Sequence, residues 1–188
     1  MSNPWDTPRA ELGETDDVPL FVAVGRALSA WSDAEEAIAY LFAFFVEAGK
    51  IDAPAIRAYS SIIGVRNRIA MVRHAADAWF DDLGCCSSKC NPYSALKDCE
   101  GWANRRNDLA HGVVDLSLDD VPAGWFFYPG YFTKKRPFFG PSSFRYNAAQ
   151  IERFAEDFSD LRERLKKVFD ELREWRASPS STTTWETY

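Results

Sequence analysis

Histidine is scarce in this sequence, since only His74 and His111 occur among 188 residues. A secretory signal is also lacking, because the first twenty residues are polar and acidic and contain no apolar segment. The longest apolar run, from Ala37 to Val46, is too short to span a bilayer and is typical of a buried helix. The lack of a secretory signal and of a long apolar run predicts a cytoplasmic protein with no membrane segment.

Positive charge is in deficit as well. The chain has 22 Lys and Arg against 28 Asp and Glu, which gives a net charge of −6. This balance excludes a protein that coats nucleic acid non-specifically, because such binding needs clustered Lys and Arg. A small local basic site on an acidic scaffold remains open. With 46% hydrophobic residues, the length indicates one globular domain with a sizeable core.

Cysteines are few and poorly placed for a metal. Only Cys86 and Cys90 have a spacing close to that of a zinc knuckle, and neither a second pair nor a nearby histidine completes a site. Together with Cys85 and Cys99 they are expected to be reduced thiols in and beside a connecting loop. We therefore expect no metal and no cofactor.

Three segments show apolar residues at steps of three and four, which is the helical period, and a further helix is predicted from the start signal Asn91-Pro92. The helix starts are marked by capping residues: Asp16 or Asp17 and Asp52, each with a proline in the first turn, Asn91 before Pro92, and Asn147, which forms a capping-box pattern with Gln150. In the second segment, Gly64 weakens the middle by up to ~1 kcal/mol relative to alanine and indicates a close helix contact or a bend. The pattern predicts an all-α protein, an antiparallel four-helix bundle, with helices over residues 16–48, 52–83, 93–111 and 147–176.

Residues 113–146, before the last helix, do not have a helical pattern. Val113 to Leu118 alternates in polarity, and Trp125 to Phe132 is typical of two short strands around a turn. We expect a small aromatic-rich β-hairpin here, packed on the bundle. The domain prediction is a flexible lead-in over 1–15, the bundle over 16–177 with its insertion at 113–146, and a disordered tail over 178–188.

The stretch from Arg105 to Gly112 concentrates the chemistry at the end of the third predicted helix. Asn107 and His111 are four residues apart and share a helix face. Arg106 supplies a multidentate ligand for phosphate, and His111 a group that titrates near neutral pH. Gly112 is predicted to end the helix in the left-handed conformation. This set suits metal-free cleavage of a phosphodiester in RNA, with His111 as general base or general acid and Arg106 stabilising the transition state.

The pattern Arg106-Asn107-x-x-x-His111 resembles the signature of HEPN domains: an arginine, a polar residue directly after it, and a histidine four to six residues beyond the arginine. The resemblance implies a helical bundle and a metal-independent endoribonuclease whose site is composite, at a homodimer interface. It also implies a role as a toxin or in antiviral defence, with a cognate antitoxin or other regulator. Independently, a single motif histidine cannot easily act as both base and acid, which also favours a symmetric dimer.

Other residues are assigned supporting or alternative roles. Arg105 and the run Lys134, Lys135 and Arg136 are candidate contacts for RNA phosphates, and the neighbouring aromatics either stack bases or simply cover the bundle. Glu35 lies on a core-facing stripe, where it either orients an arginine or histidine or reaches water at an edge.

A second arginine and histidine, Arg68 and His74, fit the spacing but lie in mid-helix, and we interpret His74 as structural or exposed. Two alternatives to an enzyme stay open. One is a non-catalytic HEPN module that binds RNA, a nucleotide or a partner protein. The other is an interaction bundle in which Arg106 and His111 only tie a helix end to Glu35 or a neighbour.

Overall fold

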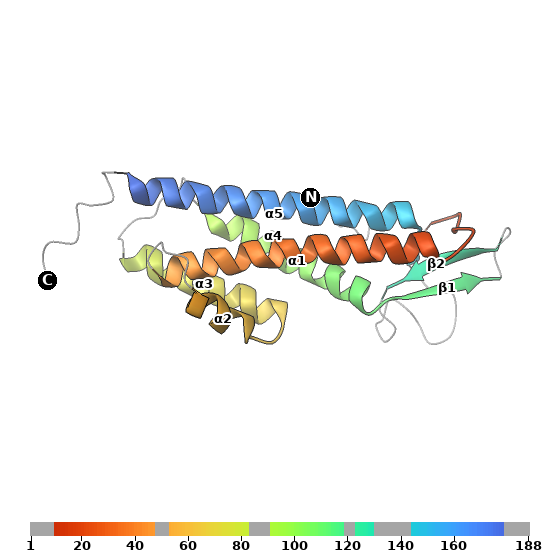
Figure 1. Ribbon diagram of the computed structural model, residues 1–188, viewed down its shortest axis with the longest axis horizontal. Helices are drawn as coiled ribbons and strands as arrows, with labels where there is room; N and C mark the ends of the chain where they lie inside the picture. The colour runs from red at the N-terminus through yellow and green to blue at the C-terminus, as the bar shows by residue number, and fades with distance from the viewer. Residues whose placement is uncertain (1–9, 48–52, 83–90, 119–122, 130–143, 179–188) are drawn as a thin grey trace, which may run out of the picture. The chain divides into compact units, whose positions relative to one another are not determined.

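The computed structural model describes residues 10–47, 53–82, 91–118, 123–129 and 144–178. Within these ranges the chain forms five helices and a two-stranded antiparallel hairpin (Figure 1). The mostly helical class with a small hairpin before the last helix is therefore confirmed. The elements are α1 (Val18–Val46), α2 (Ala53–Ser60), α3 (Val65–Asp82), α4 (Pro92–Ala110), β1 (Val113–Ser117), β2 (Gly124–Tyr128) and α5 (Ala148–Ala177).

The predicted helix starts carry the expected caps. Asp16 and Asn91 each accept the backbone N–H two residues later through a side-chain oxygen, at 3.0 and 2.9 Å. At the start of α5, Asn147 Oδ1 accepts the Gln150 N–H at 3.0 Å, and Gln150 Oε1 accepts the Asn147 N–H at 3.2 Å. This is the reciprocal capping box that the sequence predicts.

The single helix predicted over 52–83 is wrong, because the chain breaks there into α2 and α3. Gly64 adopts φ +86°, a left-handed conformation that is incompatible with a continuing right-handed helix. The hydroxyls of Ser60 and Ser61 donate to carbonyls of the preceding turn and help to end α2. The long helices are α1, α3, α4 and α5, and α2 is a short fifth one.

Strand β2 pairs with β1 in a register that runs from Val113 opposite Tyr128 to Ser117 opposite Gly124. The sequence predicted two short strands around a turn within 125–132. In the structure the aromatic strand instead pairs with β1, which precedes it in the chain. Residues 130–132 lie outside the described chain. The alternating polarity of 113–118 suits that strand pairing.

Two flanking segments add isolated bridges to β2. Trp125 and Glu14 exchange backbone hydrogen bonds of 2.9 Å, as do Phe127 and Tyr146. Glu14 also accepts the first N–H of α5 with its carboxylate, at 2.8 Å. Residues 10–14, which were included in the expected flexible lead-in, thus pair with the hairpin and cap a helix.

The chain divides into two compact units, to which α1, α4 and α5 each contribute. In the unit of residues 1–32 and 104–159, Trp31 packs edge-on against Phe158 with ring centroids 5.2 Å apart. In the unit of residues 33–103 and 160–188, Trp79 contacts Phe44 and Trp175. No helix of the described ranges has both the length and the apolarity needed to cross a membrane.

Candidate functional site

The predicted motif lies on the last turn of α4, within the unit that also holds the hairpin. Arg106 and Asn107 belong to the helix, and His111 is the first residue after it. The N–H of His111 donates to the Asn107 carbonyl at 3.0 Å, so the last turn is closed. The histidine is therefore held at a helix end, where the sequence placed it.

The solvent side of this turn carries three motif residues. Asn107 and His111 are exposed, and Arg106 is half-buried. Arg106 Nη1 donates to Asn107 Oδ1 at 3.1 Å, so the amide holds the guanidinium beside the face that Asn107 shares with His111. Arg106 Nε is buried and has no hydrogen-bond partner in the described part of the chain. The structure thus joins Arg106 to Asn107 on the solvent side of the turn.

The inner side of the same turn is occupied by an ion pair. Arg105 Nη1 lies 3.6 Å from Asp108 Oδ2, and the two side chains are only 13% and 8% exposed. Arg105 was a candidate contact for RNA phosphates, but this pairing directs its charge into the protein. It therefore contributes to the support of the motif rather than to its open face.

Tyr146 lies behind this ion pair and is almost fully buried. Burial raises the pKa of Tyr146, while the nearby Arg105 lowers it and Asp108 raises it. Tyr146 also packs edge-on against Phe154 of α5, with centroids 5.8 Å apart. Asp108 could have been found from its i, i+3 spacing to Arg105, whereas no sequence signal relates Tyr146 to them.

Gly112 follows the end of α4 but does not have the backbone conformation that the sequence predicted. Among the glycines of the described chain, Gly64 has the left-handed backbone and Gly112 does not. A β-carbon added to Gly112 would lie 2.0 Å from Cζ of Phe127. The prediction of a left-handed residue at Gly112 is thus wrong, and the glycine is needed because the ring of Phe127 packs directly on its backbone.

The aromatic insertion supplies core to this unit. Phe126, Phe127 and Tyr146 are at most 2% exposed, and the Arg145 guanidinium lies over the Phe126 ring at 4.0 Å. Tyr146 packs on Phe154 of α5, and these three buried rings cannot stack bases without unfolding. The basic run Lys134, Lys135 and Arg136 lies outside the described residues.

Glu35 and its partner both lie in the unit of residues 33–103 and 160–188. Its carboxylate lies 3.4 Å from Arg68 Nη1, with side chains 17% and 25% exposed. Arg68 Nε also donates to the Ile62 carbonyl at 2.9 Å. Glu35 thus orients an arginine, but that arginine closes the turn between α2 and α3. Arg68 has this structural use, and His74 is exposed on α3.

The described residues contain no cluster of three His, Cys, Asp or Glu side chains that could hold a metal ion. Cys85, Cys86 and Cys90 lie outside the described residues, and Cys99 is buried with a free thiol. Comparison of the chain with protein-family models, with curated proteins and with solved structures finds no match.

Proposed function

We propose that this chain is a metal-independent endoribonuclease of the HEPN type, which cleaves RNA at a composite site formed by two copies. The observation that carries the proposal is the arrangement on the last turn of α4. There Asn107 holds the Arg106 guanidinium at 3.1 Å, and Asn107 and His111 are exposed on one helix face. We also propose that the long helices α1, α3, α4 and α5 are arranged as in the bundle of HEPN domains.

The chemistry uses the ribose 2′-hydroxyl as the nucleophile. As the 2′ oxygen bonds to phosphorus, its proton passes to a neutral imidazole of His111, and the bond from phosphorus to the 5′ oxygen breaks. A protonated imidazole returns a proton to that leaving 5′ oxygen, which gives a 2′,3′-cyclic phosphate and a free 5′-hydroxyl. Arg106 donates to the non-bridging oxygens as charge develops on them. Two copies of His111 supply the base and the acid.

An exposed apolar face in the same unit offers a surface for the second copy. Val18, Phe21 and Val22 lie on one face of α1 and are 61%, 57% and 44% exposed. Two such helices packed antiparallel and centred on Val22 would bring the acidic Asp17 of one copy toward Arg26 of the other. This self-complementarity of apolar and charged positions suits an isologous dimer.

Two matched histidine variants test the proposal, since His74 and His111 are the only histidines of the chain. Purified protein in EDTA is expected to cleave single-stranded RNA, and His111→Ala to reduce the rate by ~10²–10⁴-fold. His74→Ala, on the exposed face of α3, is expected to retain full activity. An RNA with a 2′-deoxy residue at the cleavage position should stay intact.

Mixing wild-type and His111→Ala subunits tests the composite site. If both histidines of a dimer are needed, activity falls as the square of the wild-type fraction, because mixed dimers are inactive. Phe21→Asp is expected to yield monomers that no longer cleave. Cleavage by His111→Ala at the wild-type rate would contradict the proposal. Protein that binds RNA but never cleaves it would favour a non-catalytic binding module instead.

A further inference from the structure

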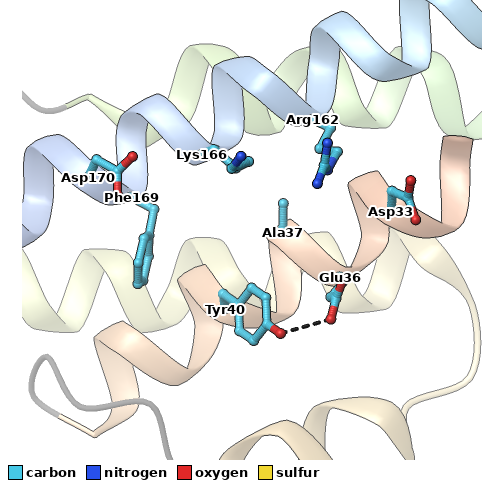
Figure 2. Close-up of a pocket in the computed structure, with 8 residues that line it drawn as sticks. All are labelled: Asp33, Glu36, Ala37, Tyr40, Arg162, Lys166, Phe169 and Asp170. Carbon is cyan, nitrogen blue, oxygen red and sulfur yellow. Dashed lines mark hydrogen bonds between the residues drawn. The ribbon is translucent and has the colours of Figure 1, made fainter.

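A second candidate site, unrelated to the motif, lies between α1 and α5 in the unit of residues 33–103 and 160–188. It is an open pocket of about 250 Å³ (Figure 2). This is smaller than the ~300–1,000 Å³ of pockets for drug-sized ligands and suits a small metabolite. The lining residues are Asp33, Glu36, Ala37 and Tyr40 from α1 and Arg162, Lys166, Phe169 and Asp170 from α5.

The two walls carry opposite charge. Asp33 and Glu36 stand on the α1 side, while Arg162 and Lys166 extend from α5 (Figure 2). In the part of the chain that the structure describes, no ion pair within 4.0 Å joins these carboxylates to these cations. Opposite charges thus face a common space without neutralising one another directly, which leaves room for a ligand that carries both signs.

Both cations also contact a carboxylate outside the pocket. Glu163 accepts from Arg162 Nη1 at 2.9 Å and lies 3.7 Å from Lys166 Nζ. A guanidinium has five N–H donors and an ammonium three, so both groups retain donors for an anionic ligand group. Both cations therefore remain available along the α5 wall of the pocket.

Two aromatic rings form the apolar part of the pocket. Phe169 packs edge-on against the buried Phe44, with centroids 5.7 Å apart, so its ring is fixed from behind. The Tyr40 hydroxyl donates to Glu36 Oε1 at 2.8 Å, which fixes the second ring (Figure 2). With Ala37 between the walls, the pocket offers an apolar contact beside its charged groups.

The charge balance selects among ligand classes. The lining has three carboxylates, with Asp170 as the third, against two cations. This excess of negative charge disfavours phosphates and other polyanions and favours a ligand whose net charge is zero or positive. We infer that this pocket binds a zwitterionic amino acid with an apolar or aromatic side chain. Its carboxylate faces Arg162 and Lys166, its ammonium faces Asp33 and Glu36, and its side chain packs on Phe169.

The test uses L-phenylalanine as the probe, with phenylacetate and phenethylamine as analogues that each lack one charge. Saturable changes in the NMR signals of Tyr40 and Phe169 are expected with L-phenylalanine at millimolar concentration. Because each analogue loses charge-assisted hydrogen bonds, binding should weaken by about tenfold or more. Equal binding of phenylacetate or phenethylamine would overturn the zwitterion assignment.

Matched lysine variants localise the binding. Lys166→Met is expected to weaken L-phenylalanine binding by about tenfold. Lys167→Met is expected to leave binding unchanged, because Lys167 is 77% exposed, is not among the lining residues and pairs with Glu171. Absence of binding by the full chain, or equal binding by both variants, would overturn the inference. Neither result depends on whether the chain cleaves RNA.

Discussion

Gly112 and Phe127 lie so close together that a β-carbon on Gly112 would stand 2.0 Å from Cζ of the ring. Phe127 is 2% exposed and exchanges two backbone hydrogen bonds of 2.9 Å with Tyr146. The ring therefore cannot move away without disturbing the hairpin and the segment before α5. The residue after His111 is thus held against a buried ring of the hairpin.

Gly112→Ala is expected to lower the free energy of unfolding by about 1–3 kcal/mol, because the added methyl group overpacks a closed site. The displacement should also reduce RNA cleavage, since His111 is the preceding residue. Urea unfolding followed by circular dichroism measures the first effect and an RNA cleavage assay the second.

Gly101→Ala is the matched control on the same helix. A β-carbon there meets no atom within 4 Å. Since alanine is favoured over glycine inside a helix, this variant is expected to stabilise the protein by up to ~1 kcal/mol and to cleave RNA normally. Equal stability changes of the same sign in both variants would show that the Phe127 contact is not what requires glycine.

This contact also shows which features of the fold could not be predicted from the sequence alone. The helix starts at Asp16, Asn91 and Asn147 were predictable, because a cap depends only on residues within one turn. The role of Gly112 was not, because it depends on a ring fifteen residues later that only the folded hairpin brings near. Gly112 does follow the end of α4, as the sequence predicted, but it does not have the predicted left-handed backbone.

The ion pair between Arg105 and Asp108 gives a second prediction. The two side chains are only 13% and 8% exposed, so removal of one takes away a nearby opposite charge from the other inside the protein. Asp108→Ala is therefore expected to destabilise the protein on the order of 3 kcal/mol. Arg105→Met alone should also destabilise it, and the double variant should lose less than the sum of the two single changes.

A double-mutant cycle by urea unfolding measures this coupling. An interaction energy near zero would mean that Arg105 and Asp108 act independently. The exposed pair Arg162 and Glu163, at 42% and 59% exposure, provides a comparison in which little coupling is expected.

Comparison of the two arginines of the motif shows what helical periodicity could and could not predict. The sequence favoured Arg106 because a polar residue follows it, and Asn107 does hold the Arg106 guanidinium. It could not foresee that Arg105 points inward, because helical position alone does not tell which face meets the hairpin. Likewise the stripe position of Glu35 left two alternatives open, a charged partner or an edge position reaching water. It could not tell that Glu35 pairs with Arg68, beyond the break in the predicted second helix.

Cys99 gives a prediction about alkaline stability. Burial, together with the neighbouring Asp98 carboxylate, raises the pKa of the Cys99 thiol from its ordinary 9.0 to about 12. In the unfolded chain the thiol ionises near its ordinary pKa, whereas in the folded protein it keeps its proton. Its contribution to stability is therefore complete below about pH 9 and is lost as the pH rises toward about 12.

Cys99→Ala removes this contribution. The free energy of unfolding of the variant should therefore fall less steeply above pH 9 than that of the wild type, by up to about 1 kcal/mol per pH unit. Both proteins should still lose stability in this range, because burial also raises the pKa of Tyr59 and Tyr146. Urea unfolding of both proteins across this pH range measures the difference, and parallel curves would show that Cys99 ionises as readily in the folded protein as in the unfolded chain.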